Sequence, residues 1–354
     1  MTNKEKIKLF IRYIVSAFLF YSRINDIYRY IARKNQVTVL MYHRVIDTTK
    51  IDKSCLQPGM YVSWQAFKMQ MEYLSQRYCV VTVGELIEAI EKGKEIQRRS
   101  CVITFDDGWK DFYSYAFPML KKYNLPATVF LVSGYVGTNH WLWPEKVSKL
   151  LIKYFATKWF EKNQPIDYSS LENMGFFRLA SEPGLTPIQK IEAIIEKMKD
   201  LEQNEIETVV NELESLLCIH PDQEYCGTLM LSWDEVKEMT QSRITFGSHT
   251  RDHSILTKVK KRKVKKEIAE SKREIEKRIL NPCFTFCYPN GNYNNEIKYI
   301  VMDHYRCAFT TQKGFVKPSD DPFALKRIDI HHDITFTKAM FACRISGILD
   351  ILGL

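Results

Sequence analysis

The sequence predicts an α/β fold: a distorted (β/α) barrel of about seven parallel strands, with a helical insertion and an N-terminal helical segment. Three observations support this prediction. Short apolar runs alternate with amphipathic stretches, the alternation stops between residues 134 and 243, and residues 1–36 differ in charge from the rest. Alternating strands and helices are typical of a parallel sheet covered by helices, and this many strands favour closure into a barrel.

Residues 1–36 are the first expected unit, a basic amphipathic segment. Eight basic and two acidic side chains give it a net charge of +6, out of +9 for the chain of 354 residues. Its apolar stretch, Tyr13 to Ser22, is shorter than the roughly 20 residues that span a bilayer, and no small-x-small cleavage pattern follows it. Two interpretations stay open, a helix on an anionic membrane surface and a helix buried in the core.

Residues 37–354 are the second expected unit, the barrel domain, and their charge is close to neutral. A nearly neutral body argues against a nucleic-acid partner. Several of the nine cysteines lie in apolar runs, where a free thiol behaves as a small hydrophobe, which indicates a reducing compartment. We therefore expect a cytoplasmic protein or one held peripherally at the cell membrane. The alternative is an exported protein anchored by an uncleaved N-terminal segment.

Eight apolar runs mark the expected strands. They are rich in β-branched and aromatic residues, as strands buried on both faces are. Amphipathic stretches such as FKMQMEYLSQR and EIAESKREIEKRI lie between them and predict the outer helices. The runs span residues 37–41, 79–82, 101–105, 127–132, 244–248, 283–288, 307–311 and 326–330.

The stretch from about residue 134 to about residue 243 is rich in helix-forming residues. It is too long for an ordinary loop, so it predicts a helical insertion over one face of the barrel. Trp141 and Trp143 near its start either stack on sugar rings or anchor the insertion to the core. Beyond it, the basic stretch Lys258–Arg278 predicts an outer helix with a solvated face; contact with a membrane or a partner is the alternative.

The run VITFDDGW places Asp106 and Asp107 at the C-terminal end of a buried strand, directly before Gly108. Adjacent carboxylates beside a core raise each other's pKa unless a cation or hydrogen bonds compensate. This arrangement is typical of a metal site or a catalytic pair, although Asp-Asp-Gly also forms ordinary turns.

Two histidines, His249 and His253, follow the expected strand at 244–248. If a helix begins near Thr250, their i, i+4 spacing places both imidazoles on one side, as a metal site requires. The C-terminal ends of barrel strands meet at one rim. One aspartate and two histidines would form there a three-ligand site with room for water, the arrangement of a catalytic metal.

A sharp turn, PNG within FCYPNGNY, follows the expected strand at 283–288. Such a turn can leave a backbone N–H pointing into the rim, where an oxyanion would need a donor. Three motifs occur in the order TFDDG, H-T-x-x-H and the YPNG turn. Together they resemble the motifs of the polysaccharide deacetylase family, also called the NodB-homology or carbohydrate esterase 4 family. The phrases LMYHRV, FPMLKKYNLPATVFLVSGYVG and LSWDEVKEM are similar too, and the likeness extends from about Val37 to about Ile334.

Carried over to this sequence, the resemblance implies that Asp106 is the general base. A divalent metal, expected to be zinc, would polarise an acetyl carbonyl and activate water, from which Asp106 takes a proton. The oxyanion would lie near the backbone N–H of Asn290, and the hydroxyl of Thr250 would steady the histidine loop. The implied metal ligands are Asp107, His249 and His253.

The chain departs from the family pattern around the base. Cys287 stands where many members have an arginine that tethers the base, and Asn290 stands where an aromatic residue is common. Arg327 in ALKRIDI either replaces the missing tether or forms a surface salt bridge. No motif identifies the general acid. The candidates, all near strand ends, are His43, His331 and His332.

These features predict metal-dependent hydrolysis of the N-acetyl amide, or alternatively the N-formyl amide, of an amino sugar in a polysaccharide or a lipid-linked glycan precursor. The expected partners are that glycan and an anionic membrane surface. The alternative from another class is a carbohydrate-binding or assembly module with weak or no turnover on the same fold. The presence of the base and of all three metal-ligand residues favours the enzyme.

Overall fold

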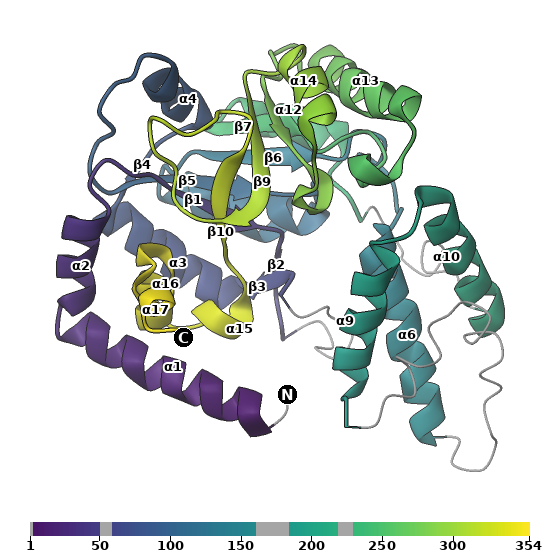
Figure 1. Cartoon of the computed structure of the whole chain (residues 1–354), viewed down its shortest axis with the longest axis horizontal. Coiled ribbons are helices and arrows are strands. Elements are labelled where there is room, and N and C mark those ends of the chain that lie inside the picture. Colours follow the sequence, from purple (N-terminus) through teal and green to yellow (C-terminus); the bar gives the residue numbers. More distant parts are fainter. Residues whose placement is uncertain (1–2, 50–58, 161–183, 219–228) are drawn as a thin grey trace.

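The computed structural model describes residues 3–49, 59–160, 184–218 and 229–354. Its main feature is a parallel sheet that closes on itself (Figure 1). The strands are β1 (Thr38–Tyr42), β4 (Cys79–Val80), β5 (Ser100–Phe105), β6 (Ala127–Leu131), β7 (Ile244–Ser248), β8 (Thr285–Cys287), β9 (Cys307–Lys313) and β10 (Leu325–Asp329). From β1 the order is β10, β9, β8, β7, β6 and β5, and β5 pairs with β1 again. Because β4 pairs only with the start of β5, the closed barrel has seven strands, which confirms the predicted fold.

The barrel strands are apolar because both of their faces are covered. Every residue of β1, β5 and β6 is buried, as expected for parallel strands between an interior and an outer layer of helices. Successive side chains point to opposite faces. Ile103 and Phe105 of β5 lie in the core under the outer helices, whereas Val102 packs with Phe130 and Phe309 from other strands in the barrel interior.

Helices surround the barrel. They include α3 (Trp64–Arg77), α4 (Val83–Glu91), α5 (Phe117–Lys122), α12 (Trp233–Thr240), α13 (Lys261–Ile279) and α14 (Asn295–Met302). Thr82 and Ser232 begin α4 and α12 with capping boxes, which satisfy backbone N–H groups of the first turn. α13 buries Val264, Ile268 and Ile275 and leaves most of its lysines and arginines exposed, in agreement with the predicted solvated helix.

A second, smaller sheet pairs β2 (Arg44–Ile46) with β3 (Tyr61–Ser63) in parallel beside the barrel. The sequence pattern does not predict it, because three residues are too few to show a period of two.

Three helices between β6 and β7 form a group of their own beside the barrel (Figure 1). They are α6 (Trp143–Phe160), α9 (Pro187–Met198) and α10 (Gln203–Leu217). Their buried side chains, among them Leu150, Ile194 and Val210, form a cluster separate from the barrel core. By contrast, α12 buries Val236 and Met239 in the barrel core, although it also falls within the stretch 134–243.

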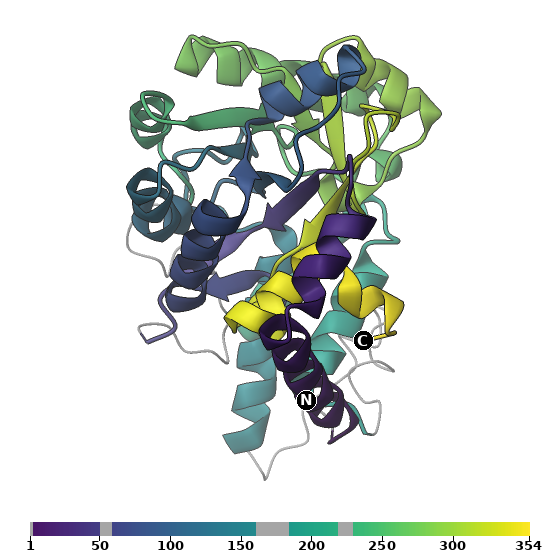
Figure 2. The same cartoon turned by 90° about the vertical axis from the view of Figure 1, so that its left-hand side faces the viewer.

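The chain begins with α1 (Asn3–Tyr21) and α2 (Ile24–Ala32), which lie against the C-terminal helices α16 (Lys338–Ser346) and α17 (Ile348–Ile351) (Figure 2). Leu19 of α1 packs with Cys343 and Leu349. The short α15 (His332–Thr335) precedes α16. None of the helices in the described part of the chain has the length and apolar character needed to cross a membrane.

Candidate active site

A cavity of about 190 Å³ lies where the C-terminal ends of the barrel strands meet. Residues that follow β1, β5, β7 and β8 line it, together with residues of α6 and α9 from the insertion. Six of the seven predicted site residues line this one cavity: His43, Asp106, Asp107, His249, His253 and Asn290. The seventh, Arg327, is buried on β10 and contacts Asp106.

Asp107, His249 and His253 point toward one another. Oδ1 of Asp107 lies 3.6 Å from Nε2 of His249 and 3.4 Å from Nε2 of His253. The other oxygen, Oδ2, accepts a hydrogen bond of 2.9 Å from Nε1 of Trp109, which fixes the carboxylate plane. Trp109 is a positioning residue that the motif alone does not reveal, although it stands only two residues after Asp107.

The loop that carries the histidines is not a helix, so the predicted reason for their convergence is wrong. Thr250 and His253 have φ angles of 67° and 55°, in the left-handed region, and α13 begins only at Lys261. The left-handed conformations of these two residues, rather than the i, i+4 spacing of a helix, bring the imidazoles together. The expected role of the Thr250 hydroxyl is also not found, because Oγ1 has no hydrogen-bond partner among the described residues.

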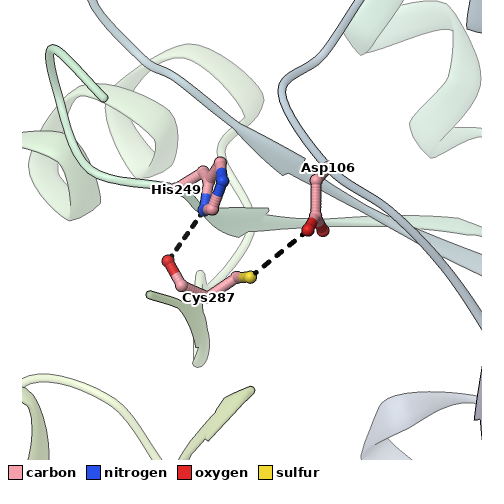
Figure 3. A group of neighbouring side chains, drawn as sticks. All are labelled: Asp106, His249 and Cys287. Atoms are coloured by element: carbon pink, nitrogen blue, oxygen red, sulfur yellow. Dashed lines mark hydrogen bonds between the residues drawn. The ribbon is translucent and has the colours of Figure 1, made fainter. Parts of the chain in front are cut away.

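The three side chains fit a divalent metal. Among the described residues, the buried Oδ1 of Asp107 accepts no hydrogen bond, which is costly for a carboxylate oxygen unless a cation is present. Nδ1 of His249 lies 2.8 Å from the carbonyl oxygen of Cys287 and donates to it (Figure 3). The Nε2 lone pair is left facing Asp107. Burial lowers the pKa of His249 to about 4, so this imidazole is neutral at pH 7, as a metal ligand must be.

A second group of possible ligands overlaps with the first and consists of Asp106, His249 and Cys287 (Figure 3). It is the weaker candidate for two reasons. Burial raises the pKa of the Cys287 thiol well above its ordinary value, so the thiolate that binds metals is disfavoured. In addition, both oxygens of Asp106 already bind a cation, Arg327.

Arg327 holds Asp106 in a bidentate ion pair inside the barrel. Nη1 and Nη2 each donate a hydrogen bond of 2.7 Å to one oxygen of Asp106, and Nε donates to the carbonyl of Thr310. The Arg327 side chain is 0% exposed, so the alternative of a surface salt bridge is wrong. Burial alone would raise the pKa of Asp106, but the charge and hydrogen bonds of Arg327 outweigh it and lower the pKa, so Asp106 is ionised at pH 7.

The small side chain of Cys287 leaves space for this arginine. Nη2 of Arg327 lies 3.0 Å from Sγ of Cys287, and that sulfur lies 3.7 Å from Oδ2 of Asp106. An arginine at position 287 would compete for the same volume and the same carboxylate. Arg327 on β10 thus supplies the contact to Asp106 that the departure at Cys287 removes.

The three histidines suggested as proton donors occupy different places. His43 lines the cavity, and its Nε2 lies 3.9 Å from Oδ2 of Asp106. His331 instead lies 3.2 Å from Asp333, and His332 stacks on the ring of Tyr61; neither lines the cavity. His43 is thus the only one of the three near Asp106.

Glu145 is a candidate site residue that the sequence does not single out. It lies in the first turn of α6, lines the cavity and is 6% exposed, and its Oε2 has no hydrogen-bond partner among the described residues. Burial, followed by the negative charge of Asp107, raises the pKa of Glu145 to about 7. A carboxyl group with such a pKa can donate a proton at neutral pH. Glu145 and His43 are therefore the candidates for the general acid.

The two tryptophans of HWLWPEKV have separate positions. Trp143 lines the cavity, where its ring can contact a sugar, whereas Trp141 packs edge-on against Trp109 with ring centroids 6.2 Å apart. The position of Trp143 therefore agrees with a sugar-stacking role, and that of Trp141 agrees with an anchoring role. Leu142, Ile195 and Lys199 complete the wall that the insertion supplies.

The exchange Glu145→Gln is expected to lower turnover by about 10² to 10⁴, because the amide keeps the shape but cannot supply a proton. Metal content should stay unchanged, since Glu145 is not one of the three clustered ligands. The measurement is turnover across pH, where the variant should lack the alkaline limb of the wild-type profile. Glu212→Gln, on the exposed face of α10, is the control. A Glu145→Gln enzyme with full turnover would leave His43 as the proton donor.

A family model and several known proteins match this chain. A family model described as polysaccharide deacetylase matches residues 93–305, which include Asp106 and the three clustered ligands but not His43 or Arg327. The protein YxkH of Bacillus subtilis is 21% identical over 297 residues, 83% of this chain and 71% of YxkH. The poly-beta-1,6-N-acetyl-D-glucosamine N-deacetylase of Staphylococcus epidermidis is 37% identical over 115 residues, 30% of this chain and 39% of that enzyme.

Solved structures share the barrel. IcaB from Ammonifex degensii has a TM-score of 0.55 at 19% identity, with 88% of this chain and 98% of IcaB covered. The Streptococcus pyogenes deacetylase PplD, solved in complex with acetate, has a TM-score of 0.54 at 18% identity, with 86% of this chain and 96% of PplD covered. At these identities the likeness establishes the fold.

Proposed function

The chain belongs to the polysaccharide deacetylase family, and from this premise we propose that it hydrolyses the N-acetyl amide of an amino sugar within a glycan. The observation that carries the proposal is the convergence of Asp107, His249 and His253 beside the ionised Asp106 in one cavity. Family membership confirms the predicted enzyme class, a hydrolase of non-peptide carbon–nitrogen bonds. The name of the Staphylococcus epidermidis relative makes poly-β-1,6-N-acetylglucosamine the first substrate to test.

In the proposed reaction, water adds to the acetyl carbonyl, the amide C–N bond breaks, and acetate and the free amine leave. A divalent ion held by Asp107, His249 and His253 would polarise the carbonyl and make water a better nucleophile at pH 7. Asp106 accepts the proton of the attacking water while Arg327 keeps its carboxylate in place. Glu145 or His43 gives the departing nitrogen its proton.

Two further features are part of the proposal. Zinc is the ion we propose, because one carboxylate and two imidazoles form the mixed ligand set of catalytic zinc sites. The backbone N–H of Asn290 is the proposed donor to the oxyanion. Its support is that Asn290 lines the cavity in a left-handed conformation with φ 56°, within a turn fixed by the hydrogen bond from Thr311 Oγ1 to its carbonyl.

We also propose that the enzyme works at the cell membrane, on a polymer or on a lipid-linked glycan precursor. The support is the net charge of +6 in residues 1–36. A cytoplasmic position or a peripheral position at the cell membrane is the first choice, and export with an uncleaved N-terminal anchor is the alternative.

The test of the hydrolysis is acetate release from β-1,6-linked N-acetylglucosamine oligomers by the zinc-loaded protein. We expect release that a chelator abolishes and that added zinc restores, and no release by Asp106→Asn prepared in parallel. Measuring formate from N-formylated oligomers in the same assay distinguishes the two acyl groups. A zinc-loaded protein that binds these oligomers but releases neither acid would support the carbohydrate-binding alternative instead.

A further inference from the structure

The outward faces of α1 and α2 expose many large apolar side chains. Eleven of the nineteen strongly exposed large hydrophobic residues in the described chain lie between positions 7 and 31. On α1 most of them are spaced by three or four residues, as on one face of a helix. They are Ile7, Phe10, Ile11, Tyr13, Ile14, Phe18 and Tyr21 on α1, and Ile24, Ile27, Tyr30 and Ile31 on α2. We call this set the N-terminal apolar face.

Both helices are held to the body by their opposite faces. Leu19 of α1 is buried against Cys343, and Oδ1 of Asn25 in α2 accepts a hydrogen bond of 2.6 Å from Oγ of Ser346. Both helices contact α16 and each other, and they lie next to one another on the outside of the molecule (Figure 2). The exposure therefore belongs to the folded protein and not to a detached terminus.

Basic side chains border the N-terminal apolar face. Lys6, Lys8, Arg23 and Lys34 are exposed along the two helices, and the guanidinium of Arg98 lies 4.3 Å from the ring centroid of Tyr30. An apolar stripe with a basic border is complementary to an anionic lipid surface. A second copy of the chain would bring the same positive charges into contact, which disfavours self-association through this face.

Four arginines line a pocket at the edge of α2: Arg29, Arg33, Arg98 and Arg99. Arg29 is only 4% exposed; its Nη2 donates to Asp26, and its guanidinium lies 4.6 Å from the ring centroid of Tyr78. The pocket itself has a volume of about 10 Å³, enough for no more than a water molecule. Arg98 and Arg99 are exposed at its edge, and guanidinium groups bind phosphate oxygens in a favourable planar geometry, so these two side chains suit phosphate groups at a surface.

We infer that the N-terminal apolar face and its basic border together dock the enzyme on an anionic membrane, with α1 and α2 in the interface and lipid phosphates against the exposed Arg98 and Arg99. The aromatic and isoleucine side chains would enter the boundary between headgroups and acyl chains, and the basic border would contact the headgroups. This surface lies outside the catalytic cavity, so the inference and the proposed hydrolysis can fail independently.

The test is co-sedimentation of the full chain with phosphatidylcholine vesicles that contain either no phosphatidylglycerol or about a quarter of it. We expect binding to the anionic vesicles only, weakened at least about tenfold by high salt, which screens surface charge. Phe10→Ser/Phe18→Ser should weaken binding at least about tenfold. Arg98→Gln/Arg99→Gln should reduce the preference for the anionic vesicles. Turnover on a short soluble oligomer should stay unchanged in both variants.

The matched control is Tyr299→Ser/Met302→Ser, which removes two exposed apolar side chains from α14 and should bind like the wild type. Ile27→Ser/Ile31→Ser repeats the test on α2. It replaces Phe10→Ser/Phe18→Ser if circular dichroism shows that the latter variant does not fold. The inference is overturned if the wild type binds neither vesicle, or if both apolar variants bind as well as it does. If the wild type does not bind vesicles but forms a dimer, and both apolar variants are monomers, the N-terminal apolar face is an interface between two copies of the chain.

Discussion

Asp107→Ala, His249→Ala and His253→Ala should each purify without metal and without measurable turnover. Each substitution removes one of three atoms that face a common point, and two ligands cannot hold a catalytic ion. Substitution of residues that only hydrogen-bond to metal ligands lowers metal affinity by about 10 to 100-fold. Substitution of a ligand itself should therefore lower metal affinity by more. The measurement is metal content per chain after dialysis, by mass spectrometry of the digested protein.

Asp106→Asn should behave differently, with metal content near that of the wild type and a loss of turnover of about 10² to 10⁴. Cys287→Ala should also keep the metal, because its protonated thiol is not a ligand in the favoured cluster. These two variants decide between the two overlapping groups of possible ligands. If both lost the metal while His253→Ala kept it, the ion would belong to Asp106, His249 and Cys287, and the assigned roles of the two aspartates would have to be exchanged.

Arg327→Ala should lower the free energy of unfolding by about 3–5 kcal/mol, because it leaves the Asp106 carboxylate buried without its cation. The lowered pKa of Asp106 means that the pair contributes stability above the unfolded pKa of about 4 and loses it as the pH falls below that value, through the folded pKa. The stability difference between wild type and variant should therefore be fully present at pH 7 and shrink only below about pH 4. Urea unfolding at pH 7 and at about pH 3 measures it.

The control for this change is Arg306→Ala, which breaks an arginine–glutamate pair at the surface and should cost at most about 1 kcal/mol. The double variant Arg327→Ala/Asp106→Asn should be more stable than Arg327→Ala alone, since no charge remains buried. Arg327→Lys keeps the charge without the two-point hydrogen bonding and should lower kcat more than it raises KM. Equal stability of Arg327→Ala and wild type at pH 7 would contradict the structural role given to this ion pair.

The barrel could be predicted because its strands are buried on both faces. Such strands are continuous apolar runs, and each of the eight predicted runs overlaps one strand of the main sheet. The left-handed residues Thr250 and His253 could not be predicted, because no side-chain pattern specifies a positive φ at threonine or histidine. The two histidines thus lie at the rim where the sequence predicts them, but left-handed residues rather than a helix bring them together.

The structure brings the predicted site residues together at one rim and adds a further candidate, Glu145. Asp106, Asp107 and the histidines follow strands directly, so strand ends alone bring them to one rim. Glu145 comes from the insertion, and no spacing along the chain relates it to the barrel motifs. For Arg327 the sequence left a surface ion pair and a tether equally open, because whether a strand residue points into the barrel or outward depends on register.

The seam of the barrel joins segments that are far apart in the chain, since Leu40 of β1 pairs with Ile328 of β10. During synthesis, Asp106 and the three candidate metal ligands leave the ribosome well before Arg327, which pairs with Asp106. Contacts of such long range form slowly and late in folding. The barrel and the Asp106–Arg327 pair are therefore both completed only when β10 has been added, and loss of that one strand would remove both.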